Sequence, residues 1–322
     1  MIVFTLCSNN YLAQAITLAD SVLKIQPTVH FVIGLVDYLD PEIDYQKFKN
    51  VTVLQCFDLG FSEFDKMLSR YNVIEFNTAV KPYYFQYLFD TYPSEEKIYY
   101  VDPDIVFYKG FEQLDSILDS NNIVLTPMLT DPGKESQFDE LVALRHGMFN
   151  LGFIGIRRSD ESFRFIGWWK ERLRDYCLID KCRGIFVDQK WIDLAPLFFE
   201  GIYILKDKGY NMAWWNFNDR KLIDTKDGYF VNSEDTPLVF FHFSGFKPGS
   251  SSITGRSSES RYGYHALPEL KGLGGEYEKE LLRNDYSFLN QVKPTLKFYK
   301  AKNTPRSRFK NKLKSLFRLL RN

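Results

Sequence analysis

Short apolar runs alternate with segments of helical periodicity along the N-terminal part of the chain, and this alternation restricts the fold more than any other feature. Residues 2–6 form one such run. The polar residues 8–10 after it favour helix N-caps, and apolar residues follow at helical spacing (Leu12, Ile16, Ala19 and Leu23). Residues 29–36, 51–57, 97–102 and 122–128 indicate further strands, and residues 78–92 a helix. Such alternation predicts an α/β fold with a mostly parallel central sheet flanked by helices.

The composition is typical of a soluble protein with one large core and an appendage. Of the 322 residues, 45% are hydrophobic, and no run approaches the roughly 20 apolar residues that span a bilayer. The N-terminus lacks the pattern of a secretory signal, so we expect a cytoplasmic protein. Without CxxC spacing, the cysteines predict reduced structural thiols (Cys7, Cys56, Cys177 and Cys182). We expect a large α/β domain over residues 1–265 and a helical segment over residues 266–322.

Charge is distributed unevenly between the body and the C-terminal tail. Residues 286–322 hold eleven Lys or Arg and no Asp or Glu, whereas residues 1–285 hold 30 basic and 41 acidic residues. Within residues 305–322, large apolar side chains fall on one helical face and basic ones on another. The tail therefore predicts an interfacial helix that binds an anionic membrane surface, with the protein peripherally associated with the inner face of the cell membrane. A solvated or self-packed tail is the alternative, and we expect no nucleic-acid partner because the acidic body would oppose it.

Two aspartates flank a proline within the mostly apolar stretch of residues 96–110. Asp102 falls at the carboxyl end of a predicted strand, where ligands bind in a parallel sheet. Asp104 comes two residues later, and Pro103 favours extended backbone before it, so both carboxylates are expected to face one ligand. A turn that merely ends the strand is the alternative, because Asp and Pro are common turn residues.

A cation would explain two adjacent carboxylates, which otherwise repel each other. Mg²⁺ typically takes one or two carboxylates together with substrate phosphates, so a metal-bound phosphorylated substrate fits this pair best. Further along, residues 238–249 place His242 in the last part of an apolar strand, with Gly245 and Lys247 just beyond. Imidazole is a good ligand for Mn²⁺ and a lysine can bind a diphosphate, although a lone histidine of this kind can also be a packed core residue.

Several segments together resemble the retaining glycosyltransferases of family 8, which include glycogenin and bacterial lipooligosaccharide galactosyltransferases. "KIYYVDPDIVFYKGFEQL" is similar to the DxD segment of that family. It is preceded by "TAVKPYYFQYLF" and followed in order by "MFNLGFIGIRR", "FVDQKWIDLAPLFF", "KGYNMAWWN" and "FHFSGFKP". The resemblance covers residues 2–249 and implies the GT-A fold, a nucleotide-diphospho-sugar donor and transfer of a sugar to an acceptor hydroxyl.

The resemblance also implies residue roles. Mn²⁺ or Mg²⁺ would be bound by Asp102, Asp104 and His242, and the donor diphosphate by Gly245 and Lys247. The nucleotide would contact the end of the first strand and a nearby tyrosine (Thr5, Leu6, Cys7, Ser8 and Tyr11), with Asp104 also near the ribose.

Further matches concern the sugar. Lys81 occupies the place of a basic residue near the donor, and Asn150 that of a main-chain turn facing the sugar. Asp188 and Gln189 would lie beside the reactive carbon, although a helix N-terminus rich in polar side chains is the alternative there. The resemblance implies a UDP-hexose donor and a glycan or lipid-linked acceptor in cell-envelope polysaccharide or lipopolysaccharide synthesis.

Two other interpretations remain open at the level of sequence. "VDPDIV" also resembles the nucleophile motif of haloacid dehalogenase-type phosphatases, although that motif normally begins its domain and here about a hundred residues precede it. A sugar- or membrane-binding module that keeps the fold without turnover is the non-enzymatic alternative. Trp214 and Trp215 are candidate acceptor contacts, because indole faces pack on sugar rings, and core packing is equally compatible with them. The serine-rich residues 249–260 predict either a lid or a surface loop.

Overall fold

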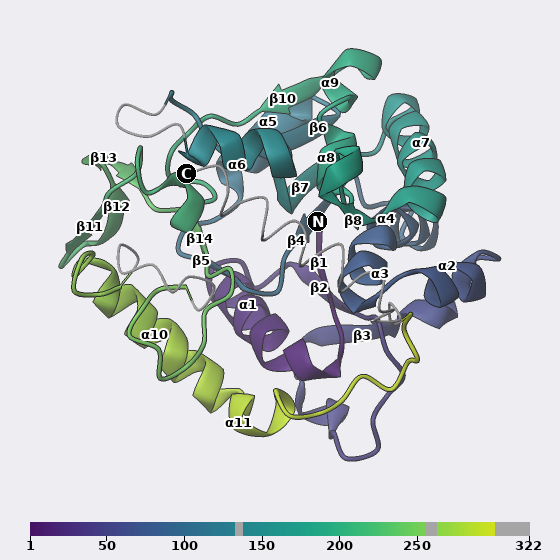
Figure 1. Cartoon of the computed structure of the whole chain (residues 1–322), viewed down its shortest axis with the longest axis horizontal. Coiled ribbons are helices and arrows are strands. Elements are labelled where there is room, and N and C mark those ends of the chain that lie inside the picture. The colour runs from purple at the N-terminus through teal and green to yellow at the C-terminus, as the bar shows by residue number, and fades with distance from the viewer. Residues whose placement is uncertain (133–137, 255–262, 300–322) are drawn as a thin grey trace, which may run out of the picture.

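A computed structural model describes residues 1–132, 138–254 and 263–299 of the chain (Figure 1). The predicted amphipathic tail over residues 305–322 and the second half of the predicted serine-rich segment, residues 255–260, lie outside these residues. Within the described part, no helix is long and apolar enough to cross a membrane.

The centre of the molecule is a seven-stranded sheet with the order β10-β6-β7-β4-β1-β2-β3. Neighbouring strands run parallel, except that β7 is antiparallel to both β4 and β6. The mixed but mainly parallel sheet confirms the predicted α/β class. The strands are β1 Ile2–Cys7, β2 His30–Leu35, β3 Val51–Gln55, β4 Lys97–Val101, β6 Ile123–Pro127, β7 Phe149–Arg157 and β10 Ile202–Ile204.

Helices cover both faces of this sheet (Figure 1). Successive residues of β1 point alternately into two core clusters, as a strand buried on both sides requires. One cluster contains α1, α5 and α10, and the other contains α4 and α7. The helices are α1 Leu12–Ile25, α2 Phe64–Arg70, α3 Val73–Ala79, α4 Lys81–Thr91, α5 Glu112–Ser120, α6 Phe138–His146, α7 Asp160–Tyr176, α8 Gln189–Ile192, α9 Ala195–Phe198, α10 Leu270–Arg283 and α11 Tyr286–Leu289.

Two local predictions were wrong. The polar residues 8–10 do not cap α1, because a short 3₁₀ turn, Asn9–Tyr11, comes first and the helix begins at Leu12 without a side-chain cap. The helix predicted over residues 78–92 is divided at Val80, where α3 ends and α4 begins. Pro82 at the start of α4 lacks a backbone N–H, so it is favoured in a first helical turn and not in a helix interior.

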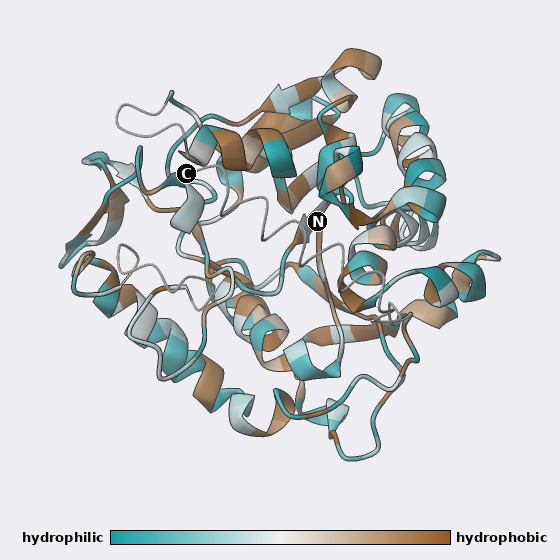
Figure 2. Cartoon of the chain, viewed as in Figure 1, coloured by the Kyte–Doolittle hydropathy of each residue, from teal (hydrophilic) through white to brown (hydrophobic). Residues whose placement is uncertain are grey.

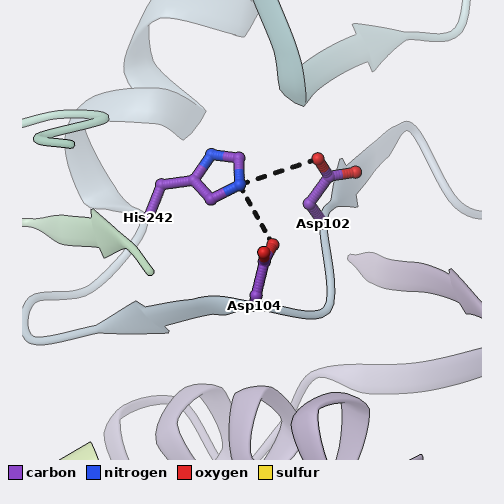
Figure 3. A group of neighbouring side chains, drawn as sticks. All are labelled: Asp102, Asp104 and His242. Atoms are coloured by element: carbon purple, nitrogen blue, oxygen red, sulfur yellow. Dashed lines mark ion pairs between the residues drawn. The ribbon is translucent and has the colours of Figure 1, made fainter. Parts of the chain in front are cut away.

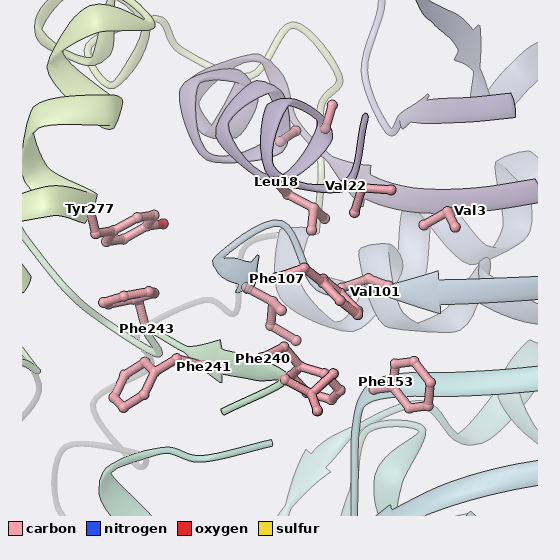
Figure 4. Packing of buried hydrophobic residues seen from close by; sticks show 14 of the residues in the cluster. Val3, Leu18, Val22, Val101, Phe107, Phe153, Phe240, Phe241, Phe243 and Tyr277 are labelled. Carbon is pink, nitrogen blue, oxygen red and sulfur yellow. The ribbon is translucent and has the colours of Figure 1, made fainter. Parts of the chain in front are cut away.

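Smaller strands form three separate sheets beside the main one. The pair β5 (Ile105–Phe107) and β14 (Phe240–His242) is antiparallel and continues from the end of β4. Its aromatic side chains join the core next to α1 and α10 (Figure 4). The remaining small strands are β8 Ile179–Asp180, β9 Ile185–Phe186, β11 Leu222–Thr225, β12 Gly228–Val231 and β13 Ser233–Pro237.

The helices after residue 265 pack on the same core as the sheet. Tyr277 of α10 stacks face to face on Phe243, with ring centroids 3.9 Å apart (Figure 4). Asn284 donates a hydrogen bond from its side chain to the hydroxyl of Thr17 in α1 at 3.0 Å. Through this stacking, α10 supports Phe243, the residue that follows β14. The domain boundary predicted at residue 265 stays a prediction.

The chain beyond α11 crosses to the carboxyl end of β2. There Asp37, 1% exposed, accepts hydrogen bonds from the backbone N–H groups of Thr295 and Leu296 at 2.7 and 2.8 Å. The Thr295 hydroxyl donates to the same carboxylate oxygen, and the N–H of Asn9 donates to the other oxygen at 3.4 Å. We call this group the Asp37 latch. It ties the C-terminal segment to the loop that follows β1.

Candidate functional site

The end of β4 and the β5–β14 pair bring the two predicted aspartates and the predicted histidine together. Asp102 directly follows β4, and its N–H donates to the carbonyl of Gly152 in β7 at 2.7 Å. In the β5–β14 register, His242 lies opposite Ile105. The N–H of Phe243 donates to the carbonyl of Asp104 at 2.8 Å. Backbone pairing therefore sets the separation of these three side chains.

Asp102, Asp104 and His242 form a compact cluster of possible metal ligands (Figure 3). The His242 Nε2 atom lies 3.0 Å from Asp104 Oδ1 and 3.8 Å from Asp102 Oδ2. One ligand atom from each residue falls within 4.8 Å of the others. Two carboxylate oxygens and one imidazole nitrogen suit Mn²⁺ or Mg²⁺, and both carboxylates are partly exposed, which leaves a side open to phosphate.

Gly152 makes room for the imidazole of the cluster. A Cβ atom at this position would lie 2.6 Å from Cε1 of His242 and 2.7 Å from Oδ1 of Asn150. The ring also packs edge-on against Trp215, with centroids 5.1 Å apart. Its orientation is thus restricted on two sides by the protein. Trp215 is buried, so its indole serves as packing for the cluster and not as an open face for a sugar.

A buried ion pair lies beside the cluster. Lys81, in the first turn of α4, is 2% exposed, and its Nζ lies 2.7 Å from Oδ2 of Asp188 and 3.9 Å from Oδ1 of Asp102. The same ammonium donates to the carbonyl of Leu151 at 2.8 Å. Burial raises the pKa of the Asp188 carboxyl, and Lys81 opposes this increase. One lysine charge therefore neutralises Asp188 and also reaches the metal-ligand cluster.

Tyr100 was missed by the sequence analysis. Its hydroxyl donates to Oδ1 of Asp102 at 2.5 Å, and its ring lies under the Lys81 ammonium, 4.3 Å from Nζ to the centroid. Burial, followed by the nearby Asp102 charge, raises the pKa of the Tyr100 hydroxyl well above its ordinary value. The phenol therefore remains a hydrogen-bond donor to the carboxylate. Its position two residues before Asp102 in a strand, on the same face, was the available signal.

The backbone that presents Asp188 is strained. Val187 has φ of 41°, in the left-handed region that a β-branched residue rarely adopts. Its N–H donates to the carbonyl of Leu178 at 3.0 Å, and its side chain is buried. Such a conformation costs on the order of 1–3 kcal/mol and persists only where the surrounding packing imposes it. The strain lies immediately before one of the predicted sugar-facing residues.

Gln189 and Asn150 form one hydrogen-bond network. The Gln189 Oε1 accepts from the Asn150 side-chain amide at 3.3 Å and from the Leu151 N–H at 3.2 Å. Its amide nitrogen donates to the carbonyl of His146 at 3.2 Å. The Asn150 Oδ1 accepts from the N–H of Gly152 at 3.2 Å. Asn150 lies within β7 and not in the predicted turn, and both side-chain amides are already engaged by protein groups.

The predicted nucleotide-binding residues are exposed to very different degrees. Thr5, Leu6 and Cys7 are buried in β1, whereas Tyr11 is 41% exposed. Ser8 donates from its hydroxyl to the side-chain oxygen of Asn10 at 2.7 Å. Side-chain contact with a ligand at this edge is therefore available mainly at Tyr11.

The predicted diphosphate segment leaves the cluster directly after β14. Gly245 has φ of 76°, a left-handed conformation that favours glycine, and Lys247 is exposed two residues later. The turn reverses the chain close to His242. The glycine is therefore required for the path of the backbone, whatever ligand binds there.

Two further sequence features can be located in the structure. The structure joins none of the four cysteines in a disulfide; Cys7, Cys56 and Cys177 are buried and Cys182 is exposed. The sequence "GLGG" (272–275) lies inside α10 and not after a strand. It therefore does not form a phosphate loop.

Comparison with known proteins supports the resemblance seen in the sequence. Residues 2–161 match the model of Glycosyl transferase family 8. Two Bacillus subtilis (strain 168) proteins described as uncharacterized, YfnD and YfnF, are 25% and 28% identical to this chain. YfnD aligns over 75% of this chain and 76% of its own length, and YfnF over 76% and 80%.

A solved structure shows the same fold. The galactosyltransferase LgtC, in complex with donor and acceptor sugar analogues, superposes with a TM-score of 0.51 at 15% sequence identity. The match covers 88% of this chain and 96% of LgtC. The similarities confirm the predicted GT-A fold and the resemblance to family 8, and they give no support to the phosphatase alternative.

Proposed function

We propose that this chain, which has the GT-A fold and resembles the glycosyltransferases of family 8, transfers a hexose from a UDP-sugar to a hydroxyl of a glycan or lipid-linked acceptor. The observation that carries the proposal is the cluster of Asp102, Asp104 and His242 beside the Lys81–Asp188 ion pair. Partly exposed ligands next to a buried, neutralised carboxylate suit a diphosphate and a polar sugar bound side by side.

Asp102, Asp104 and His242 would hold Mn²⁺ or Mg²⁺ together with the donor diphosphate. When bound, the ion would neutralise negative charge that develops on the leaving phosphate. Lys247 would add a second positive charge, brought near by the turn at Gly245. The nucleotide would lie along the end of β1 against Tyr11, an exposed aromatic residue at that edge.

The sugar would face Asp188, Gln189 and Asn150. Gln189 is a poor nucleophile because its Oε1 already accepts two hydrogen bonds. Asp188 is neutralised by Lys81 and is 1% exposed, which also weighs against a covalent glycosyl intermediate. We therefore propose retention of configuration by front-face attack of the acceptor hydroxyl, with Asp188 and Lys81 orienting the sugar.

The activity is tested by incubating the full chain with UDP-hexoses and, separately, with p-nitrophenyl phosphate. We expect hydrolysis of a UDP-hexose that depends on Mn²⁺ or Mg²⁺ and stops in EDTA, and no phosphatase activity. A thermal-shift screen of UDP-sugars with Mn²⁺ would identify the donor. Turnover unaffected by EDTA would contradict the metal assignment, and release of p-nitrophenol would favour the phosphatase.

We propose that the enzyme works in cell-envelope polysaccharide or lipopolysaccharide synthesis, with residues 305–322 as a membrane tether at the inner leaflet. Seven basic residues between Arg306 and Arg321 are each worth about 1 kcal/mol near an anionic surface. Truncation after Thr304 is expected to abolish sedimentation with phosphatidylglycerol vesicles and to leave UDP-hexose hydrolysis intact. Equal sedimentation of both proteins at low and physiological salt would show that the tail is not the anchor.

A further inference from the structure

A stripe of large apolar side chains is exposed on the segments that adjoin the proposed transfer site. Three come from α6 and the residues after it, and three from the segment that includes α9. α9 is brown at the top edge of the hydropathy view (Figure 2). Their exposure ranges from 37% at Leu194 to 76% at Leu197. We call them the apolar stripe: Leu141, Leu144, Met148, Leu194, Leu197 and Phe198.

Hydrogen bonds hold the two parts of the stripe side by side. The N–H of Met148 donates to Oδ1 of Asp193 at 2.7 Å, and Lys190 Nζ donates to the carbonyl of Leu144 at 3.0 Å. Leu141 and Leu144 are three residues apart in α6, as are Leu194 and Leu197 in the second segment. Each pair therefore lies on one side of a helical turn. Soluble proteins rarely leave such a surface uncovered without an interaction to make.

The stripe adjoins the sugar-facing residues directly. The Gln189 amide donates to the carbonyl of His146 at the end of α6, and Met148 precedes Asn150 by two residues. The backbone of Gln189 also lies against Gly147, where an added Cβ would come within 3.2 Å of the Gln189 carbonyl oxygen. A surface that binds the stripe would therefore lie next to the proposed sugar-facing residues. An acceptor hydroxyl must reach this side of the site, which we call the acceptor side.

Positive charge accompanies the stripe although the body of the protein is acidic. Arg145 and Lys181 are exposed at its edge, and Lys181 Nζ lies 2.8 Å from Nε2 of His146. Partial desolvation and repulsion from Arg145 lower the pKa of Lys181. Arg145 adjoins His146 in the chain. Because the body is acidic overall, the face that approaches an anionic membrane surface should be one where basic side chains lie beside apolar ones, as at the apolar stripe. An isologous contact with a second copy would instead bring the same cations together.

We propose that the apolar stripe docks on the surface of an anionic lipid bilayer and holds the acceptor side of the site at the lipid–water interface. This rests on the proposed function and deepens it, because the acceptor would be a lipid-linked glycan whose lipid stays in the membrane. The basic tail supplies most of the attraction, and the stripe supplies a second contact that orients the site. Two weak membrane signals together give stable anchoring where one does not.

Vesicle binding of the full chain tests the stripe. Leu144→Gln/Leu197→Gln is compared with Leu282→Gln/Ile74→Gln, a control that changes two exposed aliphatic residues on α10 and α3. The stripe variant should partition onto phosphatidylglycerol vesicles roughly tenfold less than the control, the loss expected for two partly inserted leucines. Equal partitioning of the two variants would overturn the proposal. A second variant, Arg145→Gln/Lys181→Gln, should lose about tenfold on phosphatidylglycerol but not on phosphatidylcholine.

The exposed Cys182, next to Lys181, offers a direct reporter because the other three thiols are buried. An environment-sensitive dye on Cys182 should shift to shorter wavelength with phosphatidylglycerol vesicles, and an unshifted dye would assign anchoring to the tail alone. A shift that grows with protein concentration without vesicles would show a second copy on the stripe and overturn the proposal. UDP-hexose hydrolysis without vesicles should be equal in all variants. If the unmodified protein does not hydrolyse UDP-hexose, the proposed function is refuted. The comparison of vesicle partitioning between the variants still tests the stripe on its own.

Discussion

The metal-ligand cluster and the Asp37 latch both use carboxylates that follow parallel strands at the same edge of the sheet, yet they serve different ends. Asp37 is saturated by backbone N–H groups of Thr295 and Leu296 and by the Thr295 hydroxyl. Asp102 and Asp104 instead face each other across an imidazole and stay partly exposed. A strand-end carboxylate is thus structural when neutral donors occupy both of its oxygens, as at Asp37. It is a candidate ligand when one oxygen faces another ligand group, as at Asp102, whose other oxygen accepts from Tyr100.

The largest difference between the metal-ligand cluster and the Asp37 latch should appear in the catalytic activity of their variants. Asp104→Asn or His242→Ala is expected to lower kcat/KM for UDP-hexose at least about 10³-fold, because the charge on the leaving phosphate loses its counter-ion. Thermal stability should change little. Asp119→Asn, at an exposed carboxylate of α5, is the matched control. Near-normal turnover in His242→Ala with saturating Mn²⁺ would remove the histidine from the ligand set.

The Lys81–Asp188 pair represents a third type, a carboxylate neutralised by a single buried cation. Lys81→Met should destabilise the fold by about 3 kcal/mol or more, because it leaves Asp188 buried without a partner. Lys81→Met/Asp188→Leu should recover most of that stability and none of the activity. A double variant no more stable than Lys81→Met would show that the lysine acts through other contacts, such as the Leu151 carbonyl.

The same variant should change how stability depends on pH. Burial raises the pKa of Asp188 in the folded protein, and loss of Lys81 should raise it further. A carboxyl with a raised folded pKa binds more protons when folded than when unfolded, so its effect on stability becomes more unfavourable as pH rises above the unfolded value. The stability gap between the unmodified chain and Lys81→Met should therefore widen from pH 4 to pH 7, as measured by urea unfolding. A constant gap would contradict this.

Substitutions in the Asp37 latch should lower the free energy of unfolding and leave the catalytic activity unchanged. Asp37→Ala is expected to lower the free energy of unfolding by about 2 kcal/mol, because two backbone N–H groups and a hydroxyl lose their acceptor. Thr295→Val, which removes only the hydroxyl, should cost about 1 kcal/mol. Both should keep metal-dependent turnover once donor is saturating. A loss of kcat in Asp37→Ala as large as that in Asp104→Asn would erase the distinction between the two regions.

Among the residues proposed to bind the donor, the smallest effect is expected at Lys247. Lys247→Ala should lower kcat and raise the KM for UDP-hexose, with about a tenfold combined loss, because an exposed lysine contributes a screened charge. Lys271→Ala, an exposed lysine on α10, is the control. Unchanged kinetics in Lys247→Ala would leave charge neutralisation to the metal-ligand cluster alone.

Much of the fold was accessible from local patterns. Five strands of the main sheet, β1 to β4 and β6, follow the apolar runs, because a strand buried on both faces leaves a nearly continuous apolar stretch. Neither β7 nor β10 was predicted as a strand, and the antiparallel direction of β7 depends on which neighbours it pairs with. The 3₁₀ turn before α1 and the break at Val80 were also missed. Both depend on small backbone adjustments that polar and apolar spacing does not record.

The sequence by itself determined that Asp102 and Asp104 follow a buried strand and that His242 ends another. It could not determine that Lys81 would pair with Asp188, that Val187 would adopt a positive φ, or that Thr295 would saturate Asp37. These outcomes join segments far apart in the chain, and they depend on the register of β5 with β14 and on the docking of the C-terminal segment. Tertiary structure alone decided them, because a carboxylate takes its role from the donors and charges that the packed core brings to it.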